Sequence, residues 1–406
     1  MTDILISIYK KYKSIILISV TAIPIGAAIG AIDALFGIVL LKITDFRDAH
    51  PLYLIPFLSV AGVLIAFVYK KYGGKCSRGM NLIFEAGHGD EDNIPLRLIP
   101  LIISGTWLTH LFGGSAGREG VAVQIGAAFS HFAGKILPFK NSRDIFIITG
   151  IAAGFSGLFG TPIAAVLFAI ELLTAGSIKY NALLPAFTAA FTASTTAGLL
   201  GLEKFTFALS VPTELSFTLF IKLIALGMLF GITGGAFAHC LKSAKKLAGD
   251  KLKNPIVRIA VMGAALSILF ILLYKGRYSG LGTNLINMGL NGSEIYPYDW
   301  LLKFILTILT LAAGFQGGEV TPLFSIGTAL GVTLSGIFNV PFELAAALGY
   351  AGVFCGATNT FFAPVFIGAE VFGYSYMPHF FIVCTIAYVF NMNKSIYSLQ
   401  KISKTS

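Results

Sequence analysis

The segments GIAAGFSGLFGTPIAAVLFAIE (150–171) and GYAGVFCGATNTFFAPVFIGAE (349–370) align with each other at an offset of 199 residues. Eight of the 22 aligned positions are identical, and both segments end on a glutamate, Glu171 in the first and Glu370 in the second. A glycine-rich apolar segment that occurs twice in one chain indicates an internal repeat. A chance match between two glycine-rich apolar sequences is the alternative.

A second pair of segments precedes the first pair. GSAGREG (114–120) aligns with GFQGGEV (314–320) at an offset of 200, which places Glu119 over Glu319. The two matched segments, with their aligned glycines and glutamates, come in the same order in both halves of the chain. Repeats of this kind are the usual architecture of a secondary transporter, in which the binding site lies between the halves.

The repeat sets the predicted domain organisation. We expect one transmembrane domain over residues 1–405, with repeats at about 15–201 and 215–391 and no cytoplasmic regulatory domain. The most polar stretch, 241–258, divides the chain near its middle. Glycine and proline interrupt many apolar runs, so we expect short, broken and tilted helices whose free backbone groups are satisfied by protein or by a water-filled cavity.

The composition is that of an integral membrane protein. Of the 406 residues, 56% are hydrophobic and 12% are charged, whereas soluble domains carry about 25% charged residues. A soluble protein with an oversized core is the alternative, but it would have too few polar residues to cover its surface. We therefore predict an all-α polytopic protein whose helices lie in the lipid bilayer.

The net charge of +10 does not indicate a nucleic-acid partner, because the basic residues are confined to short clusters between apolar runs. Cytoplasmic loops of membrane proteins carry such clusters. Both ends of the chain have one, so we predict cytoplasmic termini, an even number of crossings and a location in the cell membrane. The clusters comprise Lys10, Lys11 and Lys13; Lys70, Lys71, Lys75 and Arg78; Lys242, Lys245, Lys246, Lys251, Lys253 and Arg258; and Lys394, Lys401 and Lys404.

No cofactor or metal is predicted. The four cysteines are scattered without a CxxC pair, and the six histidines have no metal-ligand spacing. Isolated cysteines in apolar segments are most simply small packing residues.

The stretch GGSAGREGV (113–121) predicts an anion site at a helix start. Glycines permit a turning backbone, and the run from Val121 onward has the pattern of a helix. The first N–H groups of a helix lack intrahelical partners and carry partial positive charge, so they bind anions. The second repeat predicts the same arrangement, with Thr321 as N-cap and Pro322 as the first helical residue.

Glu119 can therefore act as a movable anion. Its ionised carboxylate can occupy the anion position, and burial makes that ionised form costly. Protonation would let the side chain leave and admit an ion, so one group would couple proton and anion movement. A structural ion pair with Arg118, or a helix cap, is the alternative to this functional role.

These motifs resemble the CLC family of anion channels and proton-coupled antiporters over about residues 20–400. GREGV (117–121) is similar to the family's GREGP, GFSGLFGTP (154–162) to its glycine-rich segment, and GGEVTP (317–322) to its second-half motif. The resemblance implies a CLC-type fold of two inverted-topology repeats. It also implies a homodimer with one pathway in each subunit, for which the apolar segments 182–201 and 378–391 would supply the interface.

Four departures from the chloride-handling pattern resemble the fluoride branch, the CLC-F fluoride/proton antiporters of bacteria. Met80 in RGMNLIFEAG (78–87) stands near the serine of the GSGIP motif, and Val121 replaces the proline of GREGP. Leu172 stands where proton-coupled chloride exchangers have an inner glutamate, so Glu171 is expected to be structural. Glu319 stands where chloride relatives have an apolar residue.

The resemblance implies roles for single residues. Glu119 corresponds to the gating glutamate and Glu319 to an inner glutamate of the fluoride branch, so both are candidates for proton transfer. Tyr397 corresponds to a tyrosine that closes the inner mouth. The implied anion-binding residues are Met80, Phe84, Gly117, Arg118, Gly120, Val121, Thr321 and Tyr397. The alternatives are packing for Met80 and Phe84, a helix cap for Thr321 and an interfacial aromatic for Tyr397.

The predicted function is secondary transport that exports fluoride in exchange for protons, with a passive anion channel for fluoride or chloride as the alternative. Fluoride is small and tightly hydrated, so strong donors must replace its water. An intramembrane enzyme acting on lipid phosphates is a further alternative. The chain lacks obvious histidine or serine partners for a nucleophile near GREG, so a non-enzymatic role is favoured.

Overall fold

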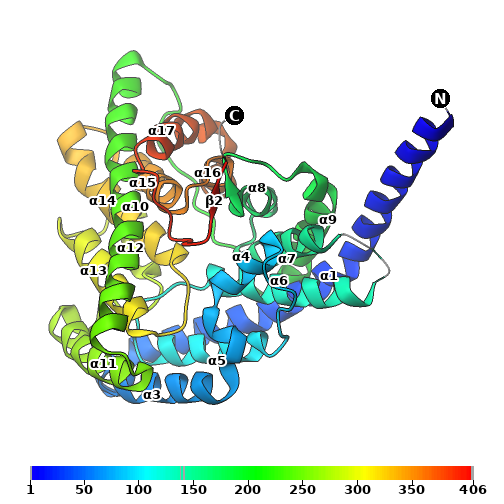
Figure 1. Ribbon diagram of the computed structural model, residues 1–406. Helices are drawn as coiled ribbons and strands as arrows, with labels where there is room; N and C mark the ends of the chain where they lie inside the picture. The colour runs from blue at the N-terminus through cyan, green and yellow to red at the C-terminus, as the bar shows by residue number, and fades with distance from the viewer. Residues whose placement is uncertain (1, 138, 140–141, 404–406) are drawn as a thin grey trace.

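A computed structural model describes residues 2–137, 139 and 142–403 of this predominantly helical chain (Figure 1). The side chains of Lys10 and Lys11, and all of Lys404, lie outside the described residues, so nothing tests their placement in cytoplasmic clusters. The helices of the first half are α1 (Thr2–Ala49), α2 (Pro51–Leu54), α3 (Leu58–Val68), α4 (Met80–His88), α5 (Leu98–Leu111), α6 (Glu119–Ile136), α7 (Arg143–Phe159), α8 (Pro162–Leu172) and α9 (Leu183–Leu199).

The second half is helical in the same way. Its helices are α10 (Phe217–Lys251), α11 (Pro255–Leu272), α12 (Thr283–Leu290), α13 (Asp299–Ala313), α14 (Val320–Phe338), α15 (Phe342–Thr358), α16 (Phe362–Phe372) and α17 (Met377–Val389). Short helical turns occupy Ile55–Phe57, Tyr69–Gly73, Gly74–Arg78, Tyr180–Ala182, Tyr274–Gly276 and Tyr374–Tyr376. A two-stranded parallel sheet joins β1 (Thr174–Ala175) to β2 (Lys401–Ile402) near the end of the chain.

Helix lengths are as uneven as the interrupted apolar runs predict. Six helical segments of the described chain are long and apolar enough to cross a bilayer, whereas others, such as α8 and α16, have only 11 residues. Figure 1 shows the long α10 along one side of the molecule and the first turns of α1 extending away from the body. The polar stretch 241–258 begins inside α10, which continues as helix to Lys251.

Glycines bring corresponding helix pairs of the two halves into close contact. A Cβ added at Gly126 of α6 would lie 2.0 Å from the carbonyl oxygen of Gly150 in α7. A Cβ added at Gly327 of α14 would lie 2.0 Å from the carbonyl oxygen of Gly349 in α15. Small residues allow helix backbones to approach closely in a membrane protein. Gly150 and Gly349 are matched positions of the aligned segments, which explains why both are glycine.

The two aligned glutamates cap helices reciprocally. Glu171 at the end of α8 accepts hydrogen bonds from the N–H groups of Phe362 (3.1 Å) and Ala363 (3.3 Å) at the start of α16. Glu370 on α16 accepts from Ile163 (3.3 Å) and Ala164 (2.9 Å) at the start of α8. Each carboxylate satisfies N–H groups that a helix start leaves free. This geometry gives Glu171 the structural role that the sequence suggests.

Replacing Glu171 with alanine is expected to lower the free energy of unfolding. The buried N–H of Ala363 and the partly buried N–H of Phe362 would lose their acceptor, which costs about 1–3 kcal/mol. Thermal unfolding of the detergent-purified protein measures the loss. Glu214, exposed between α9 and α10, supplies the matched control, since Glu214→Ala should melt like the wild type. Equal melting of the two variants would contradict the capping role.

Candidate ion-binding site

Two glycine-rich loops pair with each other at the centre of the molecule. The N–H of Gly117 donates to the carbonyl of Gly318 (2.6 Å), and the N–H of Gly318 donates to the carbonyl of Gly117 (2.8 Å). Gly317 has φ +151°, and a Cβ there would lie 2.5 Å from the Cβ of Ala116. Glycine is therefore required for this approach, and the pairing brings the starts of α6 and α14 together.

Both helices begin earlier than the sequence predicts. The helix expected from Val121 starts at Glu119, because the carbonyl of Arg118 already accepts hydrogen bonds from Val121 (3.1 Å) and Ala122 (3.2 Å). The predicted N-cap at Thr321 is also wrong. Glu319 is the N-cap of α14 and Val320 its first residue, so Thr321 and Pro322 lie inside the first turn. The loop pairing fixes the turns at Arg118 and Glu319, and both helices begin two residues ahead of the local sequence signals.

Glu119 is fully buried and lies against the start of α14. One carboxylate oxygen accepts the backbone N–H of Thr321 (3.1 Å), and the Thr321 hydroxyl donates to the other (2.7 Å). The Nε of Arg118 lies 3.7 Å from the carboxylate. The ion pair that the sequence leaves as an alternative is thus present. The hydrogen bonds to Thr321, from the other half of the chain, are shorter.

A cavity of about 310 Å³ lies on one side of this contact. Arg118, Glu119 and Thr321 line it, together with Lys204 and Tyr350. An anion in this cavity would meet two cationic side chains and the hydroxyl of Thr321, beside the carboxylates of Glu119 and Glu203. The cavity therefore gives access to the position that the Glu119 carboxylate occupies.

A second cavity, of about 510 Å³, lies beyond the paired loops. Met80, Gly120, Gln124, Glu319 and Tyr397 all line it. Glu119 lines the smaller cavity and its neighbour Gly120 the larger one. In the second half, Thr321 lines the smaller cavity and Glu319 the larger one, so the two loops form the partition between the two spaces. The candidates Met80, Glu319 and Tyr397, distant in sequence, are brought together here.

The remaining candidates lie behind the cavity walls. Val121 is fully buried in the first turn of α6, next to Gly120. Phe84 of α4 is also fully buried, and its ring centroid lies 5.4 Å from that of Tyr397. Phe84 therefore contacts a cavity residue through its ring.

The C-terminal segment holds Tyr397 in place. Its pairing with β1 places Lys401 opposite Thr174, and the N–H of Ile396 donates to the carbonyl of Ala357 (2.9 Å). The Ser398 hydroxyl bonds the Asn81 side chain (3.0 Å). These contacts fix the segment over α4 and α15, so Tyr397 stays at the cavity wall.

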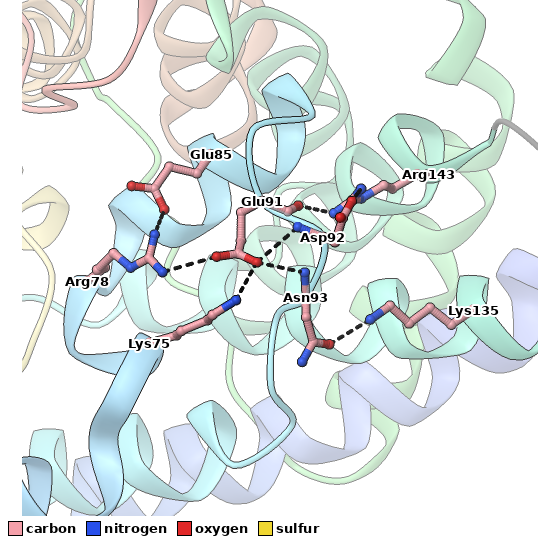
Figure 2. A network of polar contacts seen from close by, with 8 residues as sticks. All are labelled: Lys75, Arg78, Glu85, Glu91, Asp92, Asn93, Lys135 and Arg143. Carbon is pink, nitrogen blue, oxygen red and sulfur yellow. Dashed lines mark hydrogen bonds and ion pairs between the residues drawn. The ribbon is translucent and has the colours of Figure 1, made fainter.

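A polar network fixes the start of α4, which carries Met80 (Figure 2). Arg78 pairs with Glu85 and with Glu91 (3.0 Å), and Lys75 pairs with Glu91 (2.7 Å). Gly79, the N-cap, has φ +53°, a conformation that glycine adopts without strain. The network ties the turn before Met80 to the connection between α4 and α5.

Several cavity residues have no recognisable functional signal in the sequence. Gln124, one turn into α6, donates to the carbonyl of Gly120 (3.0 Å). Lys204 and Tyr350 line the smaller cavity, and Lys245 of α10 lines the larger one. The sequence indicates Lys245 only as a member of a basic cluster between apolar runs. In the described part of the chain, no group of three His, Cys, Asp or Glu side chains could hold a metal ion.

The sequence of the chain matches a known family. Residues 61–392 match the voltage gated chloride channel family. The chain belongs to this family, the CLC proteins. A chloride/fluoride channel protein of Pseudomonas syringae pv. tomato is 34% identical to this CLC protein over 380 residues, which cover 92% of this chain and 84% of that protein.

Solved structures agree with this assignment. The crystal structure of a CLC-type fluoride/proton antiporter is 52% identical, with a TM-score of 0.94, and the match covers 95% of this chain and 98% of that one. A slow cyanobacterial Cl⁻/H⁺ antiporter, 18% identical, shares the fold with a TM-score of 0.84 over 94% of this chain and 96% of that one. The predicted CLC resemblance and all-α polytopic membrane fold are confirmed. These relatives are transporters and channels rather than enzymes.

Proposed function

We propose that this CLC protein exchanges fluoride for protons across the membrane. The observation that carries the proposal is the buried Glu119 carboxylate, which accepts both the N–H and the hydroxyl of Thr321 at the start of α14. A helix start with a hydroxyl donor is a site for any small anion. The ionised Glu119 occupies it as a tethered competitor of the transported ion.

Protonation would change which anion is held. A neutral Glu119 loses most of its attraction to the helix start and to Arg118, whereas a free anion keeps it. Proton uptake then releases the position to fluoride, and return of the ionised side chain expels the fluoride. Glu319 at the larger cavity is the proposed second proton-transfer group. The proposed anion path passes Met80, Phe84, Gly117, Gly120, Val121 and Tyr397.

Fluoride is the proposed substrate for two reasons. The solved structure that is 52% identical to this chain is that of a CLC-type fluoride/proton antiporter. The donors at the site, an N–H and a hydroxyl, are suitable replacements for the water of a tightly hydrated ion. Met80 provides no strong donor, so its proposed role is to shape the path.

We further propose an orientation of the protein in the cell membrane and an oligomeric state. Arg78, Lys242 and Lys245 line the larger cavity, and basic residues favour the cytoplasmic face. In this proposal the larger cavity opens to the cytoplasm, and both chain termini also lie in the cytoplasm. The inward proton gradient then drives fluoride out across the cell membrane. A single domain over 1–405, with inverted repeats 15–201 and 215–391, forms each subunit of a homodimer through the segments 182–201 and 378–391.

A flux assay tests this proposal. Purified protein is placed in liposomes that are loaded with potassium fluoride and made permeable to potassium with valinomycin, so that outward potassium balances the charge, and fluoride and proton electrodes record the external solution. We expect fluoride release accompanied by proton uptake, and much slower release when chloride replaces fluoride. Fluoride release without proton movement would instead establish the passive channel, which the name of the Pseudomonas relative favours.

Replacing Thr321 with valine is expected to slow fluoride/proton exchange by about 10-fold or more, because a hydrogen bond to a charged group contributes about 1.5–3 kcal/mol. Thr321→Ser keeps the hydroxyl and should stay near the wild-type rate. Initial rates in the same liposome assay separate the two variants. If serine were as slow as valine, a retained hydroxyl would not preserve transport, and the role assigned to the hydroxyl would be contradicted.

A further inference from the structure

Lys245 forms an ion pair with Glu319 at the wall of the larger cavity. Its Nζ lies 3.4 Å from a Glu319 carboxylate oxygen, and both residues line the cavity. The Lys245 side chain is 47% exposed and that of Glu319 is 18% exposed. Lys245 lies on α10, whereas Glu319 is the N-cap of α14, so the pair connects a basic surface helix to the candidate proton-transfer group.

Another cation at this cavity is already neutralised. Arg78 pairs with Glu85 and Glu91, as Figure 2 shows. The hydrogen bond from Lys75 lowers the pKa of Glu91 from its ordinary 4.5 to about 2. Glu91 therefore stays ionised near neutral pH, and the charge of Arg78 is balanced whatever happens inside the cavity.

The partner of Lys245 is different, because Glu319 is itself a candidate to change its protonation state. While Glu319 is ionised, the two charges cancel. When Glu319 binds a proton, the ammonium of Lys245 faces the cavity without a counter-charge. Exposed charges act over about 8 Å at physiological ionic strength, so the freed ammonium can attract an anion within this space.

We propose that Lys245 captures the transported anion, exchanging its Glu319 partner for fluoride when Glu319 is protonated. This inference rests on the proposed function. It adds a second point of coupling, in which proton binding at Glu319 increases the affinity of the cavity for an anion. A half-exposed ammonium is suited to capturing fluoride, because the hydrated anion can approach it and keep its own water shell.

Other charged and titratable groups surround the pair. Lys242 lies one turn earlier on α10 and lines the same cavity, as do Arg78 before α4 and Tyr397 of the C-terminal segment. Glu119 lies across the paired loops. Lys242 raises the anion concentration in both protonation states of Glu319, and Arg78 stays paired with Glu85 and Glu91 in both. Lys245 responds to the protonation state of Glu319 through its ion pair.

The test uses binding and transport with four proteins: wild type, Lys245→Met, Lys245→Arg and the control Lys251→Met. Lys251 ends the same helix, is exposed and lies outside the two cavities, so its substitution removes the same charge without touching the pair. Isothermal titration of the detergent-solubilised proteins with potassium fluoride gives Kd, and liposome flux gives KM and kcat. Because Lys245 is half-exposed, all variants should elute as folded protein.

We expect Lys245→Met to raise Kd and KM for fluoride on the order of 10-fold with a smaller change in kcat, and to reduce their dependence on ionic strength. Lys245→Arg and Lys251→Met should stay close to the wild type. An unchanged Kd in Lys245→Met, an equal loss in Lys245→Arg, or an equal loss in Lys251→Met would overturn the proposal. If the wild type neither bound fluoride nor moved it with protons, the proposed function itself would fail first.

Discussion

Glu119→Gln is expected to abolish proton-coupled fluoride exchange. The amide keeps the size of the side chain but cannot bind and release a proton, so it cannot alternate between holding and leaving the start of α14. Proton transfer by a positioned side chain contributes at least about 100-fold to a rate. We expect proton uptake to fall to the level of empty liposomes, with any remaining fluoride flux uncoupled, as recorded by fluoride and proton electrodes.

Glu214→Gln is the matched control, because Glu214 is exposed in the connection between α9 and α10. It should keep both fluxes and their ratio. Gel filtration before reconstitution shows whether Glu119→Gln is folded, which separates a lost function from a lost protein. A folded Glu119→Gln variant that kept the wild-type ratio of protons to fluoride would remove Glu119 from the gating role.

The sequence could place Glu119 near a helix start because the signals are local. Glycines before the helix, an apolar run after it and the repeat of the pattern around Glu319 all lie within short segments. The error of two residues in both helix starts has a non-local cause. Gly117 and Gly318, 201 residues apart, pair and turn the chain earlier than the local signals indicate.

The other site residues could not be predicted from local sequence, because long-range packing brings them to the cavities. Lys245 belongs to a basic cluster that a sequence presents as a solvated surface, and only the path of α10 beside the start of α14 places it against Glu319. Lys204 reaches the smaller cavity from a segment without a recognised motif, and Tyr350 lies in the repeat segment 349–370 at a position where the two repeats differ. Only the family resemblance indicates Tyr397 as a site residue. Its position depends on the pairing of β1 with β2, which nothing in the local sequence predicts.

Gly150→Ala is expected to cause a large loss of stability, because it adds a methyl group at the close contact between α6 and α7. The added Cβ would lie 2.2 Å from the carbonyl oxygen of Gly126, which is backbone and cannot rotate away. The helices must separate, at a cost of about 3 kcal/mol or more. Alanine also gains about 1 kcal/mol over glycine in a helix, which does not offset this cost.

Gly336→Ala makes the same chemical change near the end of α14, where a Cβ would meet nothing within 4 Å. Only the helix gain applies there, so the two variants should shift the melting temperature in opposite directions, Gly150→Ala down and Gly336→Ala slightly up. Separating α7 from α6 also moves the helix that begins at Glu119, so folded Gly150→Ala should exchange fluoride more slowly. A Gly150→Ala protein that melts and transports like the wild type would show that these backbones are not in contact, and the placement of Glu119 against Thr321 would lose its structural support.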